Sequence, residues 1–234
     1  VRRPVRLQVR RRLHDVARGL MVGSSFFGAA SAVARAENLG VAFFVNMLPV
    51  PTRRVVDAIG GVLVTVIAGY VAFNAIKLGW LTTGQTSGSG LPLQWTFYPM
   101  GVGALLMTIF ALDLFCRRPV RDMAAGIVAT GLIAGFYLLW DRLAPDTVPP
   151  SGTLMLAGFF ITLFGGLPIG FALALAALTF IWVEGTLPGV IFAQQMARGI
   201  DNFVLLAIPF FILVGYLMEA NGMSKRLIEL LRRL

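Results

Sequence analysis

The sequence predicts an all-α integral membrane protein with about six transmembrane helices and short interfacial helices. Hydrophobic residues make up 57% of the 234 residues, charged residues only 13%, and the mean hydropathy is +0.81. A soluble domain carries about 25% charged residues, because it needs a polar shell. Several runs also reach the length of about 20 apolar residues that a bilayer-spanning helix needs. These runs must be helical, because backbone polar groups cannot stay unpaired in hydrocarbon.

Six apolar runs account for the expected helices. The first is diluted by Gly, Ala and Ser, and the fourth ends in an aromatic and charged boundary at Trp140. The runs are Val16–Val33, Val55–Leu78, Phe97–Cys116, Met123–Trp140, Thr153–Val183 and Phe203–Met218. Gly189–Ile200 is predicted to be a short interfacial helix, and Lys225–Leu234 to begin an amphipathic one.

The fifth run, Thr153–Val183, is too long for one straight span. Its 31 residues would extend roughly 46 Å as a helix, whereas the hydrocarbon core is about 30 Å thick. Gly165, Gly166 and Pro168 interrupt it. These residues either split the run into two short helices or kink one long helix. We expect a single broken or steeply tilted traverse.

Basic residues suggest the orientation in the membrane and argue against nucleic-acid binding. The net charge is +9, but the basic residues lie in short tracts beside apolar runs, such as Arg117, Arg118 and Arg121, which is typical of juxtamembrane anchoring. The positive-inside rule places this tract in the cytoplasm and the uncharged 82–94 connection outside. Residues 1–12 should then lie outside, yet they carry six arginines. Either the first run does not span, or the N-terminus is not the natural one.

The composition gives little support for a metal site or for a catalytic nucleophile. Cys116 is the single cysteine and His14 the single histidine, so the sequence has no His/Cys cluster with metal-ligand spacing. No polar catalytic set lies within the predicted spans, which argues against an intramembrane enzyme. We therefore expect a protein that is not an enzyme and has no cofactor.

Three blocks of sequence resemble the permease of the tripartite ATP-independent periplasmic (TRAP) transporter family. The first resembles the second helix of the small membrane subunit and the connection after it. The second, Gly84-Gln85-Thr86-Ser87 followed by Leu91–Leu93 and Trp95, resembles that subunit's external loop. The third resembles the opening of the large subunit. The first block comprises Asp15–Arg18, Phe26–Ala30, Glu37–Val41 and Leu48–Pro49, and the third Gly166–Leu173 and Gly199–Leu213.

The resemblance implies a domain organisation and a function. It divides the chain into a basic segment (1–13), a small-subunit-like or Q-type module lacking its first helix (14–118), a connecting helix with a Pro-rich linker (119–151), and the start of a large-subunit-like or M-type transport module (152–234). The complete protein would be a multi-pass permease of the bacterial inner membrane that couples sodium entry to uptake of an organic acid. Its partners would be a periplasmic solute-binding protein and the remainder of the large subunit. The fragment alone is expected to be inactive. The alternative is a non-transporting membrane scaffold or assembly subunit.

Candidate site residues follow from the family motifs and from polar groups in apolar runs. The substrate-binding residues are expected in the missing C-terminal part. Lys77 and Asp113 lie near predicted helix ends, where snorkelling or pairing accounts for them, and Asp201-Asn202 could cap the last helix. Trp80, Trp95 and Trp140 lie at predicted membrane boundaries. The family-motif residues with an expected structural or transport role are Gly84, Gln85, Thr86, Ser87, Gly166, Pro168, Asp201, Asn202 and Pro209.

Overall fold

The computed structural model describes residues 2–35, 45, 47, 49–87, 90–143, 149–200, 203–223, 226 and 229. Within them the regular structure is helical apart from an isolated bridge between Thr86 and Pro92, which confirms the all-α class. The helices are α1 (Arg2–Ala34), α3 (Val50–Leu81), α4 (Gln94–Cys116), α5 (Val120–Leu143), α6 (Ser151–Phe164), α7 (Ile169–Glu184), α8 (Val190–Ile200) and α9 (Phe203–Ala220).

Four helices in the described residues are long and apolar enough to cross a bilayer. They contain the stretches Asp15–Ala34, Thr52–Leu81, Gln94–Cys116 and Val120–Trp140. Each matches an apolar run read from the sequence to within a few residues. Shorter apolar helices follow, including α6 and α7. The basic N-terminal segment and the first apolar run form one continuous helix, α1.

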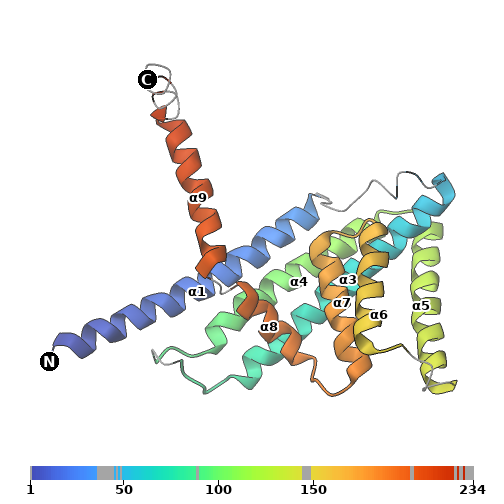
Figure 1. The fold of residues 1–234 in the computed structure, drawn as a ribbon, viewed down its shortest axis with the longest axis horizontal. Helices are drawn as coiled ribbons and strands as arrows, with labels where there is room; N and C mark the ends of the chain where they lie inside the picture. The colour runs from blue at the N-terminus through green and yellow to red at the C-terminus, as the bar shows by residue number, and fades with distance from the viewer. Residues whose placement is uncertain are drawn as a thin grey trace.

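Helices α1, α3 and α4 pack together into what we call the first bundle (Figure 1). Its core is made mostly of small and medium side chains, and Val22, Ala75 and Met100 are completely buried. Small residues let helix backbones approach closely, which is the main source of attraction between helices in lipid. The hydroxyl groups of Thr65 and Thr108 each donate to the carbonyl four residues earlier, at 2.8 Å, so neither enters the apolar core unpaired.

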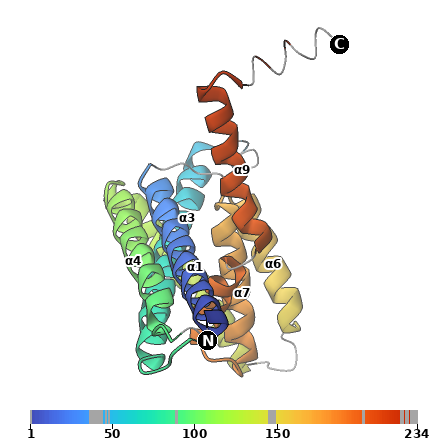
Figure 2. The same ribbon diagram turned by 90° about the vertical axis from the view of Figure 1, so that its left-hand side faces the viewer.

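Helices α6 and α7 pack on each other beside the first bundle, and we call α6, α7 and α8 together the second bundle (Figure 2). Helix α8 packs across α3 and buries Phe192, Ala193 and Ala197, so the predicted short helix forms and one of its faces is covered. Helix α5 packs mainly on α3, and most of its apolar surface is exposed. Both views show α9 projecting away from the two bundles. The predicted amphipathic helix at 225–234 lies outside the described residues, apart from 226 and 229.

The expectation of a single traverse over Thr153–Val183 is wrong. The run folds back on itself as two antiparallel helices, α6 and α7, which pack side by side (Figure 1). A side-chain carbon placed on Gly158 would lie 3.9 Å from the Thr179 hydroxyl oxygen, midway along the pair. A helix of 14 or 16 residues is only about 21–24 Å long, so each is short for a span.

The hairpin turns where the sequence places Gly165, Gly166 and Pro168. Gly166 has a φ of +82°, its N–H donates to Leu163 O at 3.1 Å, and the Leu167 N–H donates to Thr162 O at 3.1 Å. This pair of bonds around a left-handed glycine is a Schellman motif, which ends a helix and reverses the chain. Pro168 cannot continue the helix and instead precedes the first residue of α7. The break was predicted, but the reversal of direction was not.

Candidate functional site

The family-motif residues of the 84–87 turn form a compact link between α3 and α4. Gly84 adopts a φ of +84°, three residues after the end of α3. The Leu93 N–H then donates to Gln85 O at 3.0 Å, and the Ser87 N–H donates to Leu91 O at 2.8 Å. The side chains of Gln85 and Thr86 are exposed. The turn is therefore stabilised by its backbone, and its polar side chains remain available on the surface.

Gly166 and Pro168 lie at the opposite end of the first bundle. The turn that holds them borders a cavity of about 330 Å³ beside Asp57 and Gly60 near the start of α3 and Arg118 after α4. The motif residues are thus not brought together, since Gly84–Ser87 follow the other end of α3. Asp201 and Asn202 lie outside the described residues. Helix α9 continues through Pro209, whose side chain is also outside the described part.

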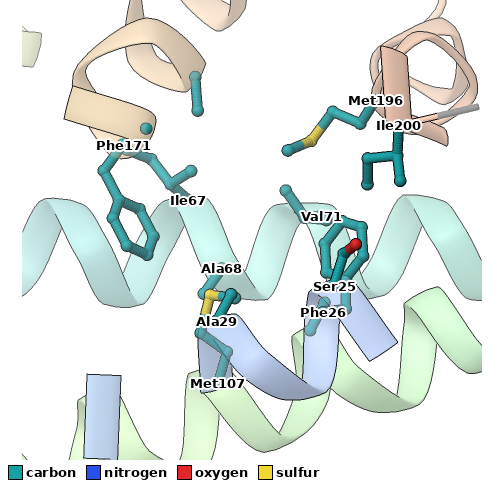
Figure 3. Close-up of a pocket in the computed structure, with 13 residues that line it drawn as sticks. Ser25, Phe26, Ala29, Ile67, Ala68, Val71, Met107, Phe171, Met196 and Ile200 are labelled. Carbon is teal, nitrogen blue, oxygen red and sulfur yellow. The ribbon is translucent and has the colours of Figure 1, made fainter. Parts of the chain in front are cut away.

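A second cavity, of about 230 Å³, separates the two bundles (Figure 3). Figure 3 shows Met196 and Ile200 pointing from α8 toward Val71 of α3. Phe171 of α7 lines the same space, and Ser25 is its one hydroxyl side chain, donating to Met21 O at 2.8 Å. With no charged or free polar group in its lining, this cavity cannot compensate the desolvation of a carboxylate. It is an apolar junction between bundles and is unsuited to an organic anion.

Lys77 and Asp113 lie near the ends of α3 and α4, as the sequence indicated. Asp113 pairs with Arg117 at 2.8 Å, one turn along α4, and both are more than half exposed. The Arg117 Nε–H donates to Asp113 Oδ2 at 3.0 Å, and this hydrogen bond, followed by the negative charge of Asp113, raises the pKa of Arg117. Lys77 is exposed, which agrees with snorkelling. Trp80 and Trp95 are 75% and 69% exposed at the two ends of the 82–94 connection, where interfacial anchoring would place them.

Sequence reasoning missed the side chains that join the two bundles. Tyr70 and Asn74 of α3 lie against Gly189 at the start of α8, and Val45 lies against Gly166. Asn74 is only 4% exposed, and its amide donates to Tyr70 O at 2.9 Å. A buried amide within an apolar span was a signal that could have marked this position. In the described residues, no three His, Cys, Asp or Glu side chains lie close enough to hold a metal ion.

Comparison with known families matches two parts of the chain. Residues 11–122 match the family described as "Tripartite ATP-independent periplasmic transporters, DctQ component", and residues 156–234 match the corresponding "DctM component". The two matches follow one another along the chain, and α5 lies almost entirely between them.

Individual relatives match most or part of the chain. The chain is 31% identical over 220 residues, 92% of its length, to the isethionate TRAP transporter permease protein DctMQ of Oleidesulfovibrio alaskensis. It is 26% identical over 94% of its length to the sialic acid TRAP transporter permease protein SiaT of Haemophilus influenzae. Over 78 residues, 33% of its length, it is 45% identical to the sialic acid TRAP transporter large permease protein SiaM of Vibrio cholerae, of which the match covers 18%. The chain spans about a third of the first two relatives, 34% and 38% of their lengths.

Proposed function

Because the chain belongs to the TRAP transporter permease family, as a multi-pass protein of the bacterial inner membrane, we propose that it is part of a sodium-coupled importer of an organic acid. The observation that supports this most strongly is the order of its two parts. A Q-type segment is followed by an M-type segment on one chain, with the α5 helix connecting them. A permease of this kind receives its substrate from a periplasmic solute-binding protein, and we include that partner in the proposal.

The described residues act as membrane scaffold in this proposal. The cavity between the bundles is apolar, and the charged groups Asp113 and Arg117 at the end of α4 are paired and more than half exposed. An organic anion and its sodium ion need polar groups that replace their hydration. The transport site therefore belongs to the rest of the large subunit, which the relatives carry beyond the matched segment. This assignment proposes a carboxylate as the substrate and does not specify which one.

The test is uptake by the complete reading frame in proteoliposomes. A periplasmic solute-binding protein from the same organism is first screened for carboxylates that raise its melting temperature. We expect uptake of that carboxylate only when the binding protein is present and sodium is higher outside the vesicle than inside.

Residues 1–234 alone, reconstituted in the same way, are the matched control and should give no uptake. Uptake by this segment alone would place the transport site within it. Uptake by the complete protein without sodium, or without the binding protein, would contradict the proposed coupling or the proposed partner respectively.

A further inference from the structure

The cavity of about 330 Å³ at the basic end of the first bundle combines apolar walls with two charged residues. Its walls come from α1, α3, α4, the turn between α6 and α7 and the start of α7. Asp57 of α3 and Arg118 after α4 are the charged residues of this lining, and every other lining residue is apolar, glycine or proline. Such a lining suits an amphiphile, because apolar walls alone cannot hold a charged group and charged walls would exclude a hydrocarbon chain.

The cavity lies at the depth where phospholipid headgroups meet hydrocarbon. The apolar stretch Thr52–Leu81 of α3 has 30 residues and is about 45 Å long, which matches the roughly 40–45 Å of a bilayer with its headgroups. Asp57 is then about 7 Å from the membrane surface. Val64, which lines the same cavity, is about 10 Å deeper, within the hydrocarbon. A phospholipid therefore has the right dimensions to place its two ends against the two parts of the lining.

Arg118 is a half-buried cation that faces this cavity without a counter-charge. Its guanidinium carbon would lie 3.7 Å from a methyl group on Gly61, so the side chain lies along α3. Within the described part of the chain, no ion pair or hydrogen bond involves that side chain, whereas Asp57 pairs with Arg53 at 3.9 Å. Partial burial of an unpaired charge costs free energy, which an anionic group in the cavity would recover.

The surroundings of the cavity are positively charged, which favours an anionic headgroup over a zwitterionic one. The segments 50–57 and 113–122 carry five arginines and three aspartates, and two of these aspartates are already paired with arginines. The arginines are Arg53, Arg54, Arg117, Arg118 and Arg121, and the aspartates are Asp57, Asp113 and Asp122. Basic pockets between transmembrane helices on the cytoplasmic side are typical sites for anionic headgroups.

We propose that this cavity binds an anionic phospholipid of the cytoplasmic leaflet, with the lipid phosphate on Arg118 and one acyl chain between α1, α3 and the turn before α7. The guanidinium N–H groups of Arg118 donate to the phosphate oxygens, an arrangement for which the planar group is well suited. The leaflet follows from the basic residues at this end of the bundle. The proposal is independent of the transported substrate and of the coupling ion.

The test is photolabelling of the complete protein in proteoliposomes, with a phosphatidylglycerol that carries a photoreactive diazirine in one acyl chain. Labelled peptides are identified by mass spectrometry. The readout is the part of the labelling in segments 111–118 and 165–171 that excess unlabelled phosphatidylglycerol removes. We expect phosphatidylethanolamine with the same acyl chains to compete roughly fivefold less well or worse, because it carries no net charge.

Arg118→Gln tests the contact with the phosphate, and Arg121→Gln is its matched control. Both variants remove one positive charge from the same end of the bundle, but Arg121 is exposed and does not line the cavity. With probe well below saturation, we expect Arg118→Gln to lower the competable labelling roughly tenfold, because a charge-assisted hydrogen bond is lost. Arg121→Gln should lower it less than about fivefold, since it weakens only the general attraction. Arg118→Lys should keep more labelling than Arg118→Gln.

Ala32→Leu tests the place of the acyl chain, and Ala34→Leu is its control on the same helix. Ala32 is half-buried and lines this cavity, whereas Ala34 is exposed and lines neither cavity. Leucine at position 32 occupies space that the acyl chain needs, so we expect a loss of competable labelling of roughly tenfold. Leucine at position 34 should leave the labelling unchanged.

Three results would overturn the proposal. Equal labelling of Arg118→Gln and Arg121→Gln would remove the phosphate contact, and equal labelling of Ala32→Leu and Ala34→Leu would remove the acyl chain from the cavity. Competition by phosphatidylethanolamine as strong as by phosphatidylglycerol would show that the site does not select an anionic lipid. Where Ala32→Leu does not yield monodisperse protein, the comparison of Arg118→Gln with Arg121→Gln decides the outcome, because neither change alters the packing of the helices.

Discussion

The crossing of α1 and α4 at Gly103 allows a quantitative prediction about the first bundle. A methyl group at this buried position would lie 2.6 Å from the Phe26 Cβ and 3.1 Å from the Phe26 carbonyl carbon. Carbon atoms pack at about 3.5–4.0 Å, so α1 would have to move away by roughly 1 Å, and a gap of that size forfeits a quarter to a half of each contact energy. Because one obstacle is backbone, a change of rotamer cannot relieve it.

We therefore expect Gly103→Ala to destabilise the bundle relative to a matched Gly→Ala change. Overpacking costs about 1–3 kcal/mol, while replacing glycine inside a helix by alanine gains up to about 1 kcal/mol. Gly28→Ala in α1 isolates the second effect, because a methyl there meets nothing within 4 Å. The free energy of unfolding, measured by equilibrium denaturation in mixed micelles, should be about 1–3 kcal/mol lower for Gly103→Ala than for Gly28→Ala. Equal stability of the two variants would refute the proposed close crossing.

Two further predictions concern the end of α4. Asp113→Asn should change the free energy of unfolding by less than about 1 kcal/mol, because its ion pair with Arg117 is mostly exposed; a larger loss in the same mixed-micelle assay would show that the pair is shielded from water. Cys116, the single cysteine and an exposed one, should react with a membrane-impermeant maleimide in inside-out vesicles and not in intact spheroplasts. Thr83→Cys in a Cys116→Ser background should show the opposite pattern, and labelling of both positions from one side would contradict the proposed orientation.

The helical content and the positions of the spans could be predicted because hydropathy is a local property. An apolar run of the required length has one stable form in lipid, so Val55–Leu78 and Phe97–Cys116 correspond closely to α3 and α4. The family could also be predicted from the sequence, because short motifs resemble those of its members. The family matches at residues 11–122 and 156–234 confirm this prediction. The proposed transport roles of the motif residues stay predictions.

The direction taken after Phe164 could not be predicted from the same information. Gly165, Gly166 and Pro168 are compatible with a kink as well as with a reversal, because both require only that the helical hydrogen bonds stop. The reversal depends on the left-handed conformation of Gly166 and on its packing against Val45, more than 100 residues earlier. Contacts over such a separation leave no periodic signal in the sequence.

The sequence by itself determined that this protein is a set of apolar helices in a membrane, and which family it belongs to, because both follow from the order of residue types along the chain. The tertiary structure decided how the two parts fit together. Tyr70, Asn74 and Gly189 are unremarkable one at a time, and they become a joint only when α8 lies across α3. Burial and close approach are properties of pairs of surfaces, and only the folded chain brings those surfaces into contact.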